Sequence, residues 1–403
     1  MKKPLVSIAR NENIGLAVNQ CLDQIEFPDL TGKNVLLKPN VGREAAPRIA
    51  INTNPDVVEA VFTYLKNRFT AKFFIGDSPI INTDTNKAFE QSGYADLLKN
   101  EELHFINLDD KSPLEMDIPD GKILKKIKLT GYLNEMDYII SLPVLKFHMH
   151  CGASLSFKNL KGLIYKKNKR NLHHLRAPEL IEQMGASGIK VKELDIAISD
   201  LSRVIKPDLA IIDASIAMEG MGPSSGNPVK MDTIIASKNF LAADMIALAL
   251  TQPDWTLKDV PHLKFISELI PNAPKTRKDV DTIPQNIDEF VKLLKGPPTS
   301  ITIKYNNVNL VDIDSCSACL STIFTLLKNN KDYIDEHFTP EKPLNLAIGK
   351  GIKKSDLYED TFLIGNCSAL QKEHAIFVQG CAPIESQIMK AIRHKIRLES
   401  DTK

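Results

Sequence analysis

Short hydrophobic runs alternate with amphipathic stretches along much of the chain, a pattern that indicates strands followed by helices. The pattern predicts buried strands at residues 35–38, 72–76, 137–142 and 209–213, and helices at residues 55–67 and 240–250. Such alternation is typical of an α/β fold with a mainly parallel sheet covered by helices. In sheets of this kind, ligands bind beyond the carboxyl ends of the strands.

Polar motifs begin where several of these predicted strands end. Lys38 and Asn40 follow the first strand, and Asp77 and Ser78 follow the second. Lys146 follows the third. We therefore expect a ligand site at this edge of the sheet.

A second, smaller α/β module is predicted at the C-terminus. Proline- and lysine-rich sequence precedes residue 298, and we place a domain boundary there. The first domain, residues 1–298, is either one body or two lobes divided near residue 140. The second, residues 299–403, has predicted strands at residues 307–313, 361–365 and 375–378 and predicted helices at 320–328 and 384–392.

Four of the six cysteines, Cys316, Cys319, Cys367 and Cys381, lie in this C-terminal module. Three of the predicted strands end just before one of them, so parallel pairing would bring all four thiols to one edge. A C-x-x-C pair with two single cysteines suits a 4Fe–4S cluster. Zinc is the main alternative, although structural zinc sites usually have two close pairs, and thirteen residues separate Cys367 from Cys381. Unliganded buried thiols are the third interpretation.

Overall composition adds little to this picture. The chain has 403 residues, a net charge of +1 and 43% hydrophobic residues, so any electrostatic attraction must be local. There is no hydrophobic run long enough for a membrane span and no signal-peptide pattern. We expect a cytoplasmic protein, in which cysteines serve as thiols or metal ligands rather than disulfides.

Positive charge is concentrated in one segment. Residues 138–178 contain no Asp or Glu, but carry six lysines, two arginines and four histidines. The run at residues 166–170, Lys167 included, is consistent with a solvated surface or a weak nucleic-acid patch. Lys146, His148, Lys158 and Lys161 differ because they stand among apolar residues, where charges are usually paired or functional. We expect these four to form a pocket for a carboxylate or phosphate.

Six motifs occur in a fixed order: VLLKPN (35–40), TNP (53–55), GDSP (76–79), LPVLKFH (142–148), SFKNLKG (156–162) and EGMGPSSG (219–226). Together they resemble the family called domain of unknown function 362, over about residues 34–250. The C-terminal cysteines are similar to a variant of that family ending in C-x-x-C, Gly-Asn-Cys and Gly-Cys-Pro-Pro, with Ala382 replacing the first proline.

A more distant resemblance concerns one pair of residues. The ten-residue spacing of His148 and Lys158 is similar to that in the nickel-dependent lactate racemase family. In that family such a histidine is an acid/base and such a lysine holds the cofactor. We do not infer a nickel cofactor for this chain from a single His–Lys spacing.

These observations favour an iron–sulfur redox enzyme acting on an anionic small molecule. His148 would be the acid/base, and Asp77 or Asp213 could orient it. Lys158 would be a further catalytic residue, in contact with the substrate. Predicted substrate-binding residues are Lys38, Asn40, Ser78, Lys146, Asn159, Lys161, Glu219 and Gly220.

Two other functions remain open. One is a non-catalytic electron-transfer or cluster-carrier protein that docks a redox partner protein. The other is a zinc-stabilised RNA-binding protein, which sparse aromatic residues and neutral net charge argue against.

Overall fold

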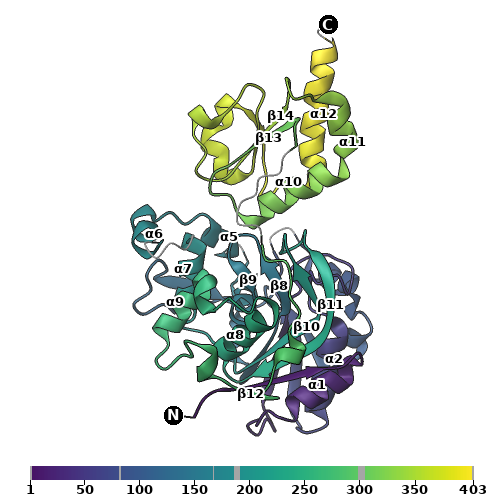
Figure 1. Cartoon of the computed structure of the whole chain (residues 1–403), viewed down its shortest axis with the longest axis vertical. Helices are drawn as coiled ribbons and strands as arrows, with labels where there is room; N and C mark the ends of the chain where they lie inside the picture. The colour runs from purple at the N-terminus through teal and green to yellow at the C-terminus, as the bar shows by residue number, and fades with distance from the viewer. Residues whose placement is uncertain (1, 81–82, 167, 186–190, 298–304, 402–403) are drawn as a thin grey trace. The chain divides into compact units, whose positions relative to one another are not determined.

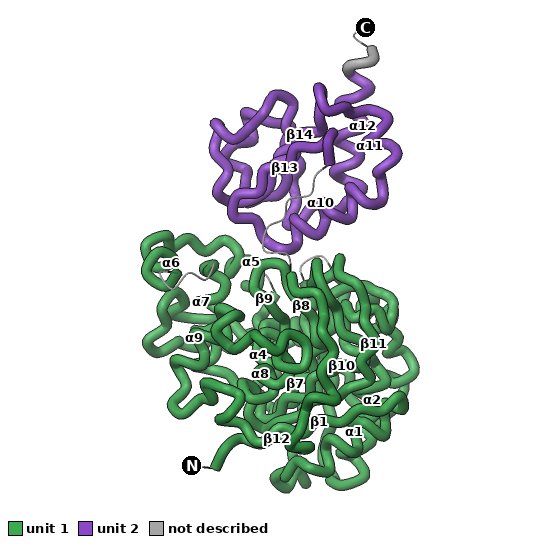
Figure 2. Tube along the Cα trace, in the orientation of Figure 1, with its two compact units in different colours: residues 1–297 green, residues 298–403 purple. Residues whose placement is uncertain are grey.

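The chain folds as two units, Met1–Pro297 and Pro298–Lys403 (Figure 2). The structure, a computed structural model, describes residues 2–80, 83–166, 168–185, 191–297 and 305–401. Lys167 and residue 298, the expected domain boundary, lie outside the described residues.

Unit 1 is built on a ten-stranded sheet. Residue 140, near which two lobes could have divided, lies within a central strand of this sheet. Its main path runs β12-β1-β11-β10-β7-β2-β3-β4, and β8 and β9 branch from β10. The strands are β1 (Leu5–Arg10), β2 (Asn34–Pro39), β3 (Lys72–Asp77), β4 (Leu103–Asn107), β7 (Tyr138–Leu142), β8 (Val144–His148), β9 (Gly152–Ser154), β10 (Leu209–Glu219), β11 (Asn227–Ser237) and β12 (Asp281–Ile283). β5 (Leu114–Asp117) and β6 (Lys126–Leu129) form a separate hairpin.

Parallel pairing covers the part of this sheet where the polar motifs lie. β10, β7, β2, β3 and β4 are successive parallel neighbours. The exceptions are β11, which is antiparallel to both β1 and β10, and the short β8–β9 pair. The prediction of a mainly parallel α/β sheet is therefore confirmed, with an antiparallel ribbon that the sequence analysis missed.

Helices cover both faces of the sheet, as Figure 1 shows for α1 and α2 on one side and α8 and α9 on the other. The helices of unit 1 are α1 (Ile14–Leu22), α2 (Pro55–Lys66), α3 (Thr85–Phe89), α4 (Ser156–Asn159), α5 (Asn168–His173), α6 (Pro178–Gly185), α7 (Glu193–Leu201), α8 (Phe240–Thr251) and α9 (Pro261–Leu269).

Alternation along the strands divides the core between the two faces. In β2, Val35 and Leu37 pack in the cluster that includes α1 and α2, whereas Leu36 packs in the cluster that includes α8. Helix α2 begins where the sequence provides a start: the Asn54 side chain accepts a hydrogen bond from the Asp56 N–H, and Pro55 occupies the first turn.

Unit 2 is the smaller α/β module that the sequence predicted, but its sheet has four strands where three were expected, because the strand at residues 344–348 was not recognised. The strands β13 (Val308–Asp312), β14 (Leu344–Ile348), β15 (Phe362–Ile364) and β16 (Ile376–Val378) are all parallel, in the order β13-β14-β15-β16. Its helices are α10 (Ser317–Asn329), α11 (Lys331–His337) and α12 (Glu385–Asp401). Each strand therefore directs its carboxyl end to the same edge of the sheet.

Candidate functional site

A buried ion pair lies at the carboxyl ends of β2 and β3. The Lys38 ammonium is 2.7 Å from Asp77 Oδ1, and the two side chains are 0% and 2% exposed. Lys38 also donates to Asn159 Oδ1 at 3.1 Å and to the Pro39 carbonyl at 2.9 Å. Burial lowers the pKa of Lys38, and the Asp77 carboxylate opposes that shift. Lys38, Asp77 and Asn159 are thus held together at the base of the site.

Gly162 packs directly against this ion pair. A Cβ atom at Gly162 would lie 2.0 Å from Asp77 Oδ1 and 2.6 Å from Lys38 Nζ. Real Cβ contacts are not this short, so a side chain at this position would displace the pair. The glycine of the SFKNLKG motif therefore allows close approach to Lys38 and Asp77.

Next to the ion pair lies a cationic cluster, which we define as Lys146, His148, His150, Lys158, Lys161 and His173. Lys146, at 7% exposure, donates to Asn40 Oδ1 at 2.7 Å and to the Ile51 carbonyl at 2.6 Å. Burial lowers the pKa of Lys146 to about 7, and the positive charges of Lys158 and Arg43 contribute. The environment of Lys146 therefore favours loss of its proton much more than the environment of an exposed lysine does.

His148 is 5% exposed at the end of β8. Its Nδ1 accepts a hydrogen bond from the His150 backbone N–H at 3.2 Å. Burial, followed by the charges of Lys158, His150, Lys161 and Lys146, lowers the pKa of His148 well below its usual value. The ring is therefore neutral, and because Nδ1 is an acceptor, its hydrogen lies on Nε2. In this arrangement His148 presents an N–H donor at Nε2.

Lys158 and Lys161 complete the cluster from α4 and the turn that follows it. Lys158 donates to Ser154 Oγ at 3.0 Å, and the Lys161 ammonium is 3.5 Å from His173 Nε2. Burial and these lysines lower the pKa of His173 well below its usual value, so its ring is neutral too. Asp195 is the nearby carboxyl that senses both lysines, but burial raises its pKa to about 7. Within the described residues, the hydrogen bonds of Lys146 and Lys158 go to neutral oxygen atoms rather than to a carboxylate.

Ser78 has a partner that the sequence analysis did not assign to it. Its hydroxyl contacts the Lys169 ammonium and the Asp109 carboxylate. Lys169 also donates to the Pro79 carbonyl at 3.3 Å, and burial lowers its pKa to about 8. This lysine belongs to the run at residues 166–170 that the sequence analysis treated as surface, yet it is 9% exposed.

The glycine-rich segment lies at the turn between β10 and β11. The Glu219 carboxylate accepts a hydrogen bond from the Lys295 N–H at 2.9 Å, and the Gly220 N–H donates to the Lys295 carbonyl at 2.8 Å. These two residues therefore hold the chain near the end of unit 1. Gly222 approaches β8, since its carbonyl accepts a hydrogen bond from the Met149 N–H at 3.0 Å.

Apart from Ser78, which contacts Lys169 and Asp109, the predicted site residues of unit 1 fall into three groups. Lys38, Asp77 and Asn159 form the buried base; Asn40, Lys146, His148, Lys158 and Lys161 lie in or against the cationic cluster; Glu219 and Gly220 contact Lys295. Among the described residues, His148 makes no hydrogen bond to Asp77 or Asp213. Asp213 instead accepts hydrogen bonds from the Asn54 N–H and from Ser215.

Unit 2 brings the four C-terminal cysteines toward one another. Cys316 is the N-cap of α10, and Cys367 and Cys381 follow β15 and β16 at the carboxyl edge of the sheet. The pKa of Cys319 is raised first by a hydrogen bond to Cys316 and by burial, and then by the charges of Cys316, Cys367 and Cys381. All four sulfurs are therefore within electrostatic range of one another.

The loops around these thiols are shaped by glycine and by a reciprocal pair of hydrogen bonds. A Cβ at Gly365, where φ is +100°, would lie 3.1 Å from Cys319 Sγ and 3.8 Å from Cys367 Sγ. The Asn366 N–H donates to the Gly380 carbonyl at 2.8 Å, and the Gly380 N–H donates to Asn366 Oδ1 at 2.9 Å. The loops that carry Cys367 and Cys381 are thereby fixed to each other.

Four thiols are the kind of donor set that iron–sulfur clusters use, and at Gly365 the positive φ and the nearby Cys319 Sγ disfavour a side chain. Burial raises the pKa of Cys367 to about 11, with further contributions from Cys316 and Cys381. A bound cationic centre would reverse these shifts, since coordinated thiols are deprotonated. In the described part of the chain, no three His, Cys, Asp or Glu side chains are grouped closely enough to be identified as a single-ion site.

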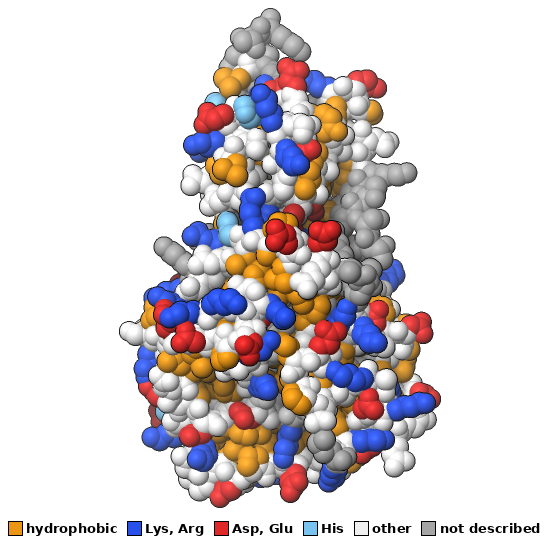
Figure 3. Space-filling view, turned by 90° about the vertical axis from the view of Figure 1, so that its left-hand side faces the viewer, with side chains coloured by type: hydrophobic (Ala, Val, Ile, Leu, Met, Phe, Trp, Pro, Cys, Tyr) orange, Lys and Arg blue, Asp and Glu red, His pale blue; other side chains and the backbone are white. Residues whose placement is uncertain are grey.

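Two further features of the described residues are the character of their helices and the distribution of charge on their surface. None of their helices is long and apolar enough to cross a membrane. On the face in Figure 3, acidic and basic side chains are interspersed over unit 1.

Two solved structures have partial similarity to the chain. One is the lactate racemase apoprotein from Thermoanaerobacterium thermosaccharolyticum, with 14% sequence identity and a TM-score of 0.40 over 64% of this chain and 57% of that one. The other is a Thermotoga maritima protein, with 13% identity and a TM-score of 0.36 over 60% of each chain. Neither is similar enough to support a functional argument.

Sequence comparison gives a stronger relationship. A thylakoid-associated protein from Synechocystis sp. (strain ATCC 27184 / PCC 6803 / Kazusa) is 29% identical over 223 residues, which are 55% of this chain. The match spans 64% of that relative, less than two thirds of its length. The model of the family described as domain of unknown function (DUF362) matches residues 35–249, which include the ion pair and the cationic cluster. The chain therefore belongs to the DUF362 family.

Proposed function

We propose that this protein is an iron–sulfur enzyme that acts on a small carboxylate or phosphate held by the cationic cluster. The observation that carries this proposal is the charge around His148. Burial, and then the charges of Lys158, His150, Lys161 and Lys146, lower the pKa of His148 well below its usual value. Asp77, the acidic neighbour of Lys146, is already paired with Lys38. A bound anion would supply the missing negative charge.

The geometry supports distinct roles for the cluster residues. Lys158 and Lys161 would attract and orient the anion. Both side chains are partly buried, and their ammonium groups can donate charge-assisted hydrogen bonds to a bound anion. The neutral His148 ring would donate its Nε2 hydrogen to an oxygen that becomes negative during the reaction, as preorganised donors do. Lys146, with its pKa of about 7, would accept or return a proton.

The four cysteines of unit 2 would hold the iron–sulfur cluster, which would supply or accept one electron when bound. Cys316, Cys319, Cys367 and Cys381 provide the four thiolates that such clusters use. The acid–base groups of the cationic cluster would then transfer protons to or from a substrate whose charge changes when it is oxidised or reduced.

Anion binding is tested by thermal unfolding of the whole protein in increasing inorganic phosphate or malonate, with chloride at matched ionic strength as reference. We expect both anions to raise Tm beyond chloride, since a ligand that binds only the folded state stabilises it. Lys158→Met should weaken the apparent affinity about tenfold or more, which is the loss of one charged hydrogen bond. Lys206→Met, at an exposed lysine of the same unit, should leave it unchanged. Equal Tm shifts with all three anions would contradict the proposal.

The cofactor is tested by measuring iron, acid-labile sulfide and zinc in protein purified without oxygen. We expect about four irons and about four sulfides per chain, as in a 4Fe–4S centre. Cys367→Ser should lose most of both, whereas Cys21→Ser should retain them, because Cys21 is buried in unit 1 against the Ser7 carbonyl. One zinc per chain without sulfide would replace the redox interpretation by a structural metal site.

A further inference from the structure

Helix α12 of unit 2 has a row of basic side chains that the proposed function does not use. Lys390, Arg393, His394 and Arg397 are exposed and follow the spacing i, i+3, i+4, i+7, which places them on one face of the helix. At 1.5 Å per residue, the row is about 10 Å long. Lys395 lies on a different side of α12 and pairs with Asp360 at 2.6 Å.

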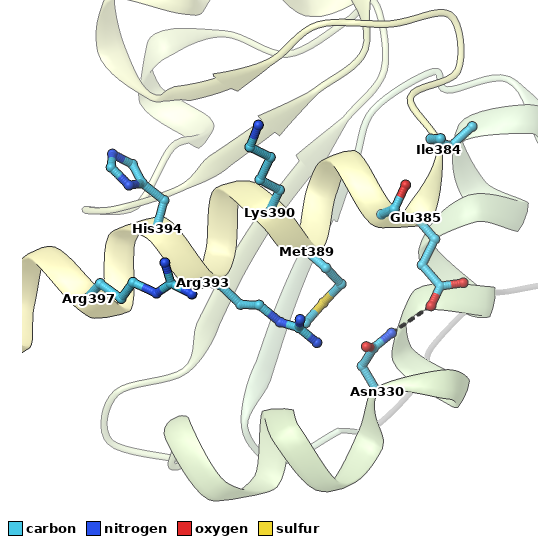
Figure 4. Close-up of a pocket in the computed structure, with 9 residues that line it drawn as sticks. Asn330, Ile384, Glu385, Met389, Lys390, Arg393, His394 and Arg397 are labelled. Atoms are coloured by element: carbon cyan, nitrogen blue, oxygen red, sulfur yellow. Dashed lines mark hydrogen bonds between the residues drawn. The ribbon is translucent and has the colours of Figure 1, made fainter.

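The basic row lines a groove of about 750 Å³ on unit 2 (Figure 4). Glu385 also lines it, but its two carboxylate oxygens accept hydrogen bonds from the Asn330 and Asn329 amides at 2.7 and 3.0 Å. Within the described residues, no carboxylate oxygen lies within 4.0 Å of the charged atoms of Lys390 or Arg393. These charges are therefore available to an acidic partner.

The arrangement of the row indicates the kind of partner. In Figure 4, Lys390 and His394 point to one side of α12, whereas Arg393 extends toward Met389 and Asn330. The Arg393 guanidinium lies 5.2 Å from the centre of the Tyr333 ring, a cation–π contact that restricts its position. Charges that do not converge on one point do not match a single phosphate. A row of charges matches several carboxylates on the surface of another protein.

We propose that the basic row of α12 is the docking surface for an acidic electron-carrier protein. Helix α12 begins at Glu385, four residues after Cys381, so the row lies on the same unit as the four thiols. The inference rests on the iron–sulfur cluster of the proposed function. The reduced carrier would lose one electron and the cluster would gain one, with no bond made or broken.

The test uses full-length protein purified without oxygen and a small acidic 2Fe–2S ferredoxin as the probe. Binding is measured by calorimetry, and cluster reduction by stopped-flow absorbance at two salt concentrations. In Lys390→Glu/Arg393→Glu we expect the association rate constant at low salt to fall about tenfold or more. The matched control, Lys328→Glu/Lys354→Glu, changes the charge equally at exposed lysines of unit 2 outside the groove and should remain close to the unaltered protein.

The outcomes separate this inference from the proposed function. The protein could contain no iron or sulfide while the groove variant alone loses ferredoxin binding. That result would support the docking surface and contradict the cluster. Equal losses in the groove and control variants would overturn the docking surface, since net charge alone would then account for binding. A groove variant that loses retention on a polynucleotide column but binds ferredoxin normally would overturn it too.

Discussion

Lys38→Met is expected to lower the free energy of unfolding by about 3–5 kcal/mol, the usual cost of leaving one member of a buried ion pair without its partner. Asp77 would remain 2% exposed without the ammonium now 2.7 Å away. Equilibrium unfolding in urea, monitored by circular dichroism, measures the change. The control is Lys33→Met, which removes a surface pair 3.8 Å from Asp137 and should cost less than about 1 kcal/mol.

A second variant makes the result specific to the pair. Lys38→Met/Asp77→Asn removes both charges, so it should cost less than the sum of the two single changes. Additive costs, or a Lys38→Met protein as stable as Lys33→Met, would show that Lys38 and Asp77 do not depend on each other.

Asp244→Asn is expected to change the pH dependence of stability. Asp244 is fully buried, accepts hydrogen bonds from the Ser156 N–H and hydroxyl through Oδ1, and has no hydrogen-bond partner for Oδ2 among the described residues. Burial raises its pKa from 3.8 to about 7. Well below its ordinary pKa of 3.8 the carboxyl is neutral in both the folded and the unfolded chain. Between pH 4 and 7 the unfolded chain loses the proton first, so stability falls by an amount on the order of 4 kcal/mol.

Asparagine does not titrate, and its oxygen can still accept the Ser156 hydrogen bonds. The free energy of unfolding of Asp244→Asn relative to the unaltered protein should therefore rise as pH increases from 4 to 8. Urea unfolding of both proteins at several pH values gives this difference and cancels the titration of all other groups. A difference that stays constant with pH would show that Asp244 ionises normally.

Much of the fold could be predicted from the sequence because local patterns determine it. The strand ending at Lys38 and the helix beginning at Pro55 have clear hydrophobic runs and start signals, and both occur with nearly the predicted bounds. The antiparallel ribbon was missed because β10 continues past Asp213 to Glu219 through an irregularity between Ala214 and Ile216. That extension is interrupted by Ser215, and the short apolar run at residues 234–236 of its partner β11 was not recognised as a strand.

The candidate site was only partly predictable, because its contacts join distant parts of the chain. Lys38 and Asp77 were each predicted as site residues, but their pairing across 39 positions has no local signature. Lys169 lies 91 positions from Ser78 and could not be distinguished by sequence from the other charged residues of its run. The hydrogen bond from the His150 backbone N–H to His148 Nδ1, which bears on the proton position of the ring, could not be predicted from the sequence either. The convergence of the four cysteines was easier to predict, since parallel strands end at one edge.

The reciprocal hydrogen bonds between Asn366 and Gly380 have a consequence for how the proposed cofactor would be acquired. They fix the spacing of the Cys367 and Cys381 loops with backbone and amide groups alone. The conformational entropy of these loops is thus lost when unit 2 folds, not when a metal binds. Small zinc domains, in contrast, fold only around their metal. Unit 2 is therefore expected to fold first and receive its cofactor afterwards, as a preformed receptor for cluster delivery.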